Sequence, residues 1–133
     1  MTSKTKPNLL SFKAAFEVEQ ARRETERRER EDAERRQQEE DLARAEELYA
    51  ALAGEPEFLA KHALTVDRRR YTVSLDHADF RIAAYFEAGQ ANVTAADKRT
   101  TLPGATAPRK RESVDSVAEA LGVMAQYLVD ETR

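Results

Sequence analysis

The segment ARRETERREREDAERRQQEE, residues 21–40, constrains the fold more than any other part of the chain, because almost none of its side chains can enter a hydrophobic core. Arg, Glu, Gln and Ala are nevertheless good helix formers. Opposite charges recur four residues apart, as in Glu24–Arg28 and Arg27–Glu31, and such pairs face each other on a helix surface. We therefore predict a helix here that is stabilised by its own surface charges and acts as a spacer.

A short apolar stripe precedes the charged segment. Leu9, Phe12 and Phe16 fall at positions i, i+3 and i+7, a spacing that places apolar side chains on one helix face, and Leu10 lies beside them in the sequence. We expect these four residues to anchor a protein partner or a second copy of the chain. Folding back onto the chain's own domain and lying on a membrane surface are the alternatives, and Glu17 and Glu19 weigh against the membrane.

Composition limits the class of protein. The 133 residues include 35% charged residues and no cysteine, and the net charge is −3, so disulfides, thiolate metal sites and a cysteine nucleophile are excluded. No apolar run approaches the ~20 residues that cross a bilayer, and the N-terminus lacks the uninterrupted apolar segment of a signal peptide. These features predict a cytoplasmic protein without a membrane span, and the richness in Ala, Arg and Glu is typical of a bacterial genome of high GC content.

The remaining pattern predicts an α+β protein. Residues 1–8 are expected to be a flexible N-terminus, and residues 9–53 a long charge-rich helix whose apolar positions from Leu42 to Leu52 pack on the domain or on a second copy. Residues 55–133 are expected to form a small α+β domain. It begins with a short helix over residues 55–64, whose inward side includes Phe58 and Ala63.

The rest of that domain is predicted from a change of period. Apolar residues alternate over 71–75 and 80–86 and continue at 93–95, which predicts a three-stranded antiparallel meander. Residues 97–112 contain two prolines and a glycine and are predicted to be a loop. A C-terminal amphipathic helix, capped by Ser113 and widened by Ala118 and Ala125, is expected to cover the sheet.

Candidate chemistry is sparse. His77 lies between Asp76 and Asp79, as in a metal site or an acid–base pair, but a polar hairpin turn explains the same residues. His62 is expected to be a half-exposed surface residue. No convergent acid, base and nucleophile is visible, so we predict no catalytic residue, no metal site and no cofactor, and we expect a non-enzymatic protein.

A basic cluster supports an alternative function. Lys98, Arg99, Arg109, Lys110 and Arg111 lie in and beside the predicted loop, and such a patch can contact phosphates. The order helix, three strands, helix is also similar to that of double-stranded-RNA-binding domains, whose last helix begins beside a basic cluster. This similarity concerns the order of elements and not the sequence, and acidic Glu112 and Asp115 stand where phosphate would approach.

The sequence therefore favours a small interaction or adaptor protein. The apolar tip at Leu9, Leu10, Phe12 and Phe16 would bind a protein partner or a second copy, and the α+β domain would offer a second surface. Nucleic-acid binding through the basic loop 98–111 is the alternative, and an enzyme is the third possibility.

Overall fold

The computed structural model describes residues 10–99 and 108–133. The chain divides into two compact units, Met1–Arg36 and Gln37–Arg133, and helix α1, Phe12–Ala53, contributes residues to both. The predicted α+β class is confirmed, but the prediction of three strands is wrong, because the sheet has five. The predicted flexible segment 1–8 lies outside the described residues.

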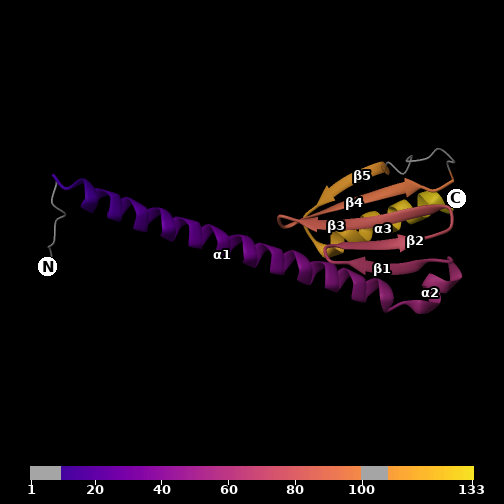
Figure 1. Ribbon diagram of the computed structural model, residues 1–133. Helices are drawn as coiled ribbons and strands as arrows, with labels where there is room; N and C mark the ends of the chain where they lie inside the picture. Colours follow the sequence, from indigo (N-terminus) through magenta and orange to yellow (C-terminus); the bar gives the residue numbers. More distant parts are fainter. Residues whose placement is uncertain (1–9, 100–107) are drawn as a thin grey trace. The chain divides into compact units, whose positions relative to one another are not determined.

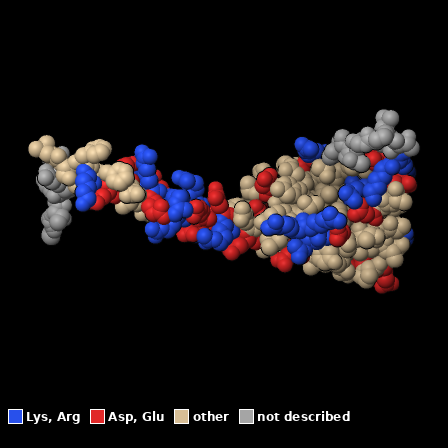
Figure 2. Space-filling model, in the orientation of Figure 1, with Lys and Arg blue, Asp and Glu red and all other residues tan. Residues whose placement is uncertain are grey.

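The N-terminal part of α1 begins at a local cap. The Ser11 hydroxyl accepts a hydrogen bond from the Ala14 amide at 3.1 Å, which satisfies one of the amides that the first helical turn leaves without a partner. From Phe12 to Arg36 no side chain is buried. Acidic and basic side chains alternate along this part of the helix instead (Figure 2).

The C-terminal part of α1 belongs to the second unit and enters its core. Ala45 and Leu48 are fully buried, and Tyr49 and Leu52 pack against the same core. The apolar positions after Leu42 therefore pack on the chain's own domain. The helix ends before Gly54 as predicted, and the short helix α2, Pro56–Lys61, follows.

The five strands form a single antiparallel meander in the order β1-β2-β3-β4-β5. The three predicted strands correspond to the second, third and fourth strands of this sheet. The fourth is longer than the sequence predicted. The strands are β1 Thr65–Arg69, β2 Thr72–Asp76, β3 Phe80–Glu87, β4 Gln90–Asp97 and β5 Pro108–Val114.

Both missed strands lie at the edges of the sheet. β1 reads TVDRR and β5 reads PRKRESV, so neither carries the apolar alternation that reveals a central strand. Charged residues and proline are typical of edge strands, where they discourage pairing with other chains. The predicted loop 97–112 is therefore wrong at its end, since β5 begins at Pro108, and residues 100–107 lie outside the described residues.

The sheet buries one face, here called the inner face. The helix α3, Val117–Glu131, packs on this face against β3, β4 and β5 (Figure 1). Its buried residues and the C-terminal part of α1 complete one core with the strands. The strand residues of this core are Val73, Leu75, Phe80, Ile82, Ala84, Phe86, Ala91, Val93 and Ala95.

Helix α3 begins three residues later than predicted. Ser116, not Ser113, is the cap, and its hydroxyl accepts a hydrogen bond from the Glu119 amide at 3.1 Å. The Glu119 carboxylate in turn accepts hydrogen bonds from the Asp115 amide and from the Ser116 hydroxyl, a variant of the capping box in which the amide before the cap is bound. Ala118 and Ala125 are exposed rather than part of the buried stripe of α3, which Ala120, Val123 and Tyr127 widen instead.

The α2 region also departs from the prediction. Phe58 was expected to face inward but is 46% exposed. Ala63, also expected inward, is exposed in a backbone conformation with a φ of 56°. Leu64, the next residue, is buried, and Leu59 is partly buried against the same core, so these leucines form the inward side of the segment.

A buried carboxylate ties α1 to the β3–β4 turn. Both central residues of this turn have positive φ, 53° at Ala88 and 82° at Gly89, as in the type I′ turns that join antiparallel strands. The Asp41 side chain is 4% exposed and accepts hydrogen bonds from the Ala88 and Gly89 amides, each at 3.0 Å. Gln37 donates a further hydrogen bond to the same carboxylate at 3.1 Å.

Candidate functional site

The N-terminal stripe is the most exposed apolar feature of the described residues. We use this name for Leu10, Phe12 and Phe16, whose exposed fractions are 96%, 87% and 55%. Val18 is 58% exposed but lies about 200° around the helix from Phe16. Phe12 and Phe16 are four residues apart in α1, so both point from one face of the helix. Leu9, predicted to be a fourth anchor, lies outside the described residues.

Local ion pairs support the helix behind the stripe. Arg22 bonds to Glu19 and, through Nη1, to Glu26 at 2.6 Å. Arg27 bonds to Glu24 and, through Nη1, to Glu31 at 2.7 Å. Of the predicted pairs four residues apart, Arg22–Glu26, Glu24–Arg28 and Arg27–Glu31 are present, and pairs three residues apart supplement them.

These pairs also change the acidity of the carboxylates. Hydrogen bonds from Arg22 and Arg23 lower the pKa of Glu19 to about 2. A hydrogen bond from Arg27 likewise lowers the pKa of Glu24. Glu19 therefore stays ionised, and keeps its arginine partners, over almost the whole accessible pH range.

An apolar groove lies within the second unit, between α1, α2 and α3 over strand β2. It encloses about 400 Å³. Leu75, Met124 and Leu128 are buried at its base, whereas Phe58 and Val129 are 46% and 57% exposed at its lips. Its lining residues are Leu52, Glu55, Phe58, Leu75, Leu121, Met124, Ala125, Leu128 and Val129.

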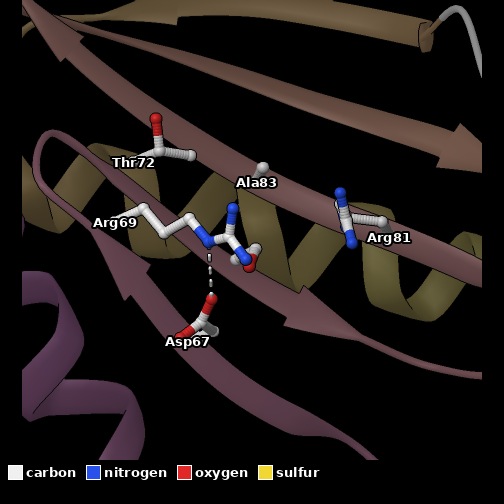
Figure 3. A pocket seen from close by; sticks show the side chains of 6 residues that line it. Asp67, Arg69, Thr72, Arg81 and Ala83 are labelled. Carbon is white, nitrogen blue, oxygen red and sulfur yellow. Dashed lines mark ion pairs between the residues drawn. The ribbon is translucent and has the colours of Figure 1, made fainter.

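A polar hollow of about 340 Å³ lies on the other face of the sheet, here called the outer face. Asp67, Ser74 and Ala83 stand side by side in the strand register, and the small Ala83 side chain leaves the centre open. Figure 3 shows Arg69 of β1 reaching over this hollow and Arg81 of β3 at its other side.

The charges of this hollow are balanced by neighbours. Arg81 Nε donates to the Asp76 carboxylate at 2.6 Å, and Lys98 Nζ donates to it at 2.9 Å. Partial burial raises the pKa of Asp76, but these two hydrogen bonds outweigh it and the pKa lies below its usual value. Arg69 forms a longer ion pair with Asp67, at 3.8 Å. The hollow therefore combines opposite charges and has no strong preference for a polyanion.

The structure does not gather the predicted basic cluster on one surface. Lys110 lies on the inner face, where it donates to Asp130 at 2.5 Å and sits 5.5 Å from the Tyr127 ring. Arg111 is the next residue of β5 and pairs with Thr94 of the outer face. The side chain of Arg109 is outside the described residues.

The other two members of the cluster are at the end of β4. Lys98 donates to Asp76, and Arg99 donates to Asp97 and to Glu131, each at 2.9 Å. Three of the four described basic side chains thus contact carboxylates. Nothing in these contacts tests whether they bind phosphate, so nucleic-acid binding stays a prediction.

The predicted turn at His77 is present, with the imidazole in a structural position. His77 Nδ1 accepts a hydrogen bond from the Asp79 amide at 3.0 Å, and its ring stacks on Phe80 with centroids 4.5 Å apart. Within residues 10–99 and 108–133, no group of three or more His, Asp or Glu side chains is placed to hold a metal ion. No helix in the same ranges is long and apolar enough to span a membrane.

The groove and the hollow were missed in the sequence. Leu121, Met124 and Leu128 have the spacing of one helix face in the sequence, but the gap beside them depends on where α2 lies. The only available signal was Phe58, an aromatic residue in a short segment between Gly54 and the first strand.

No protein family model, curated protein or solved structure matches this chain.

Proposed function

We propose that the chain is a non-enzymatic interaction or adaptor protein that binds a protein partner through its N-terminal stripe. Phe12 and Phe16 are the central anchors, with Leu10 beside them, and Leu9 is included as an anchor from the sequence. The α+β unit of residues 37–133 supplies a second surface.

The exposure of the stripe carries this proposal. Phe12 is 87% exposed at the start of a helix that is mostly charged from Arg22 to Asp41. Scattered exposed apolar residues are common, but clustered large ones mark interaction sites. Aromatic anchors four residues apart on a helix are the arrangement that helix-in-groove recognition uses.

The charged segment supports the same function. Because its helix is stabilised by ion pairs between its own residues, it does not need to bury an apolar face to stay helical. An apolar stripe at the start of such a helix can therefore remain available to a partner.

The test is partner capture by the full chain. A Phe12→Ser/Phe16→Ser variant should lose the proteins that the unmodified chain retains in a pull-down, because both anchors are removed. Tyr85→Ser is the matched control, since Tyr85 is an exposed aromatic residue of the sheet (39% exposed). An unchanged set of retained proteins, for this variant and for a chain lacking residues 1–20, would contradict the proposal.

The dependence of binding on salt distinguishes apolar docking from nucleic-acid binding. The basic residues that would bind nucleic acid are Lys98, Arg99, Arg109, Lys110 and Arg111. A phosphate contact loses affinity steeply between low and moderate salt, whereas apolar docking barely responds. A gel-shift titration at two salt concentrations separates the two functions.

A further inference from the structure

The exposed large apolar side chains of the described residues fall mostly into two patches. Five of the seven belong either to the N-terminal stripe, which contributes Leu10, Phe12 and Phe16, or to the lips of the apolar groove, Phe58 and Val129. Val18, on another face of α1, and Tyr85, on the outer face of the sheet, are the other two. In a chain with 35% charged residues, this concentration points to two docking elements and not to scattered exposure.

The two patches are complementary in shape. The stripe presents protruding aromatic side chains on a helix face, with Phe12 and Phe16 one turn apart. The groove is concave and lined mostly by aliphatic side chains from three helices and β2. Its volume of about 400 Å³ falls within the ~300–1,000 Å³ range of pockets that enclose apolar groups.

The two patches also match in charge. Glu55 is the one charged side chain that lines the groove among the described residues. Lys13 lies between Phe12 and Phe16 in the sequence of the stripe, and its side chain is 84% exposed with a long 3.9 Å contact to Glu17. Glu55 makes no side-chain hydrogen bond at the start of α2, so its carboxylate is available to a cation that accompanies the stripe.

We propose that the occupant of the groove is the N-terminal stripe of a second copy of this chain. Phe12 and Phe16 of one copy enter the groove of the next, and Lys13 pairs with Glu55 across the contact. This inference rests on the proposed function, because it names the partner of the same stripe.

The contact is heterologous, because a stripe meets a groove and not another stripe. Such a contact closes into a reciprocal dimer or a ring where the rotation between copies allows it, and otherwise leaves one stripe and one groove unfilled at the two ends of a head-to-tail assembly. In either case we expect the average mass of the full chain to rise with concentration above that of a monomer.

Two variants that each block one side of the contact test this geometry. Phe12→Ser/Phe16→Ser removes the anchors and leaves the groove intact. Val129→Glu places a charge at the exposed lip of the groove and leaves the stripe intact. Each variant alone should be monomeric by light scattering after size-exclusion chromatography, and an equal mixture should form a 1:1 heterodimer that grows no further.

The affinity change should be large if the phenylalanines are the anchors. Loss of one central aromatic anchor commonly weakens an interface by about 30-fold or more. Tyr85→Ser should assemble like the unmodified chain. Circular dichroism and thermal unfolding of both variants show whether they remain folded, which Val129 and Phe12 should permit because both are exposed.

A charge exchange provides a second, independent test. Lys13→Glu and Glu55→Lys should each weaken assembly by placing like charges together. The double variant should restore it, because the pair is reversed and not removed. Failure of the double variant to recover assembly would contradict the Lys13–Glu55 contact and with it the proposed seating of the stripe.

The remaining outcomes separate this inference from the proposed function. A chain that stays monomeric at all concentrations, including one whose stripe occupies its own groove, would overturn the inference. So would assembly that Val129→Glu leaves unchanged. In either case the proposed function stands if Phe12→Ser/Phe16→Ser still abolishes capture of another protein, and it fails if that variant changes neither assembly nor capture.

Discussion

Helix α1 contains two regions that are helical for different reasons. From Phe12 to Arg36 no side chain is buried, and arginines bond to carboxylates three or four residues away. From Gln37 to Ala53 the helix contributes Ala45 and Leu48 to the core, and Asp41 binds the β3–β4 turn. The first region depends on its own sequence, and the second depends on residues distant in the chain, such as Ala88 and Gly89, which are 47 and 48 positions from Asp41.

The difference means that the two regions respond to different perturbations. Contacts between exposed charges weaken with salt and with protonation, whereas apolar burial responds to the volume and polarity of the side chain. A change in one region should therefore leave the other nearly unaffected, and this expectation can be tested at single residues.

The largest effect is expected in the core of the second region. Leu48→Ala removes a side chain with no exposed surface, and such substitutions cost about 2–5 kcal/mol because they leave a cavity. Urea unfolding of the full chain should show this loss in the free energy of unfolding. Glu47→Ala, at the exposed neighbouring position, should change it by no more than ~0.5 kcal/mol, and equal effects would contradict the assignment of Leu48 to the core.

The next largest effect is expected at Asp41. Asp41→Ala removes the acceptor of the Ala88 and Gly89 amides in a partly buried turn, and the loss of a hydrogen bond to a charged acceptor costs about 1.5–3 kcal/mol. The free energy of unfolding should fall, and the amide hydrogens of Ala88 and Gly89 should exchange faster with solvent. Asp41→Asn keeps one side-chain oxygen, so its free energy of unfolding should lie between those of the unmodified chain and of Asp41→Ala. An unperturbed turn in Asp41→Ala would show that the carboxylate does not support it.

Titration of the Glu19 carboxylate with acid should distinguish the first region of α1 from the second. The Glu19 pKa of about 2 lies below the ~4.3 of an unperturbed glutamate. Because the folded pKa is depressed, the stabilisation is complete above pH ~4.3 and is lost as the pH falls through about 2. The Glu19 carboxyl carbon, followed by NMR, should titrate near pH 2 and move upward in an Arg22→Gln/Arg23→Gln variant, and a midpoint near 4 in the unmodified chain would contradict the pairing.

The smallest effect is expected from single ion pairs of the first region. Arg27→Gln removes the bonds to Glu24 and Glu31, and amide exchange over residues 24–31 should rise by about twofold for each pair. The difference should disappear in 1 M salt, where the screening length is about 3 Å. Arg30→Gln is the control, because Arg30 makes no ion pair with any described residue, and an equal response would argue against the specific pairs.

The sequence was most informative where the pattern is local or strongly periodic. The charged helix, the cap region at Gly54 and the central strands β2, β3 and β4 were predicted because their residues carry helix propensity or alternate along the chain. The end of the alternation at residue 86 and its return at 93 also leave a connection at Ala88 and Gly89. The need of this connection for a carboxylate from residue 41 was not visible, because the two segments are 47 positions apart.

The edge strands show where pattern reasoning fails. Val66 is the one apolar residue of β1, and Arg109, Lys110 and Arg111 suggested a basic loop, yet the pairing Arg68↔Val73 and Arg111↔Thr94 makes both segments strands. An edge strand is held by hydrogen bonds to its neighbour and has little apolar surface of its own, so it lacks the alternating apolar pattern by which strands are predicted. The same pairing places Lys110 and Arg111 on opposite faces of the sheet. The sequence had instead suggested one basic patch.

By itself the sequence determined that a charge-rich helix forms, that an apolar stripe lies at its start and that an α+β unit follows, because helix propensity, charge spacing and alternation act over a few residues. The tertiary structure alone decided the number of strands, the position of Asp41 under the β3–β4 turn and the groove between Phe58 and Val129. Those features arise from hydrogen bonds and packing between segments distant in the chain, whose energies depend on where the partner segment lies and not on the residues beside them.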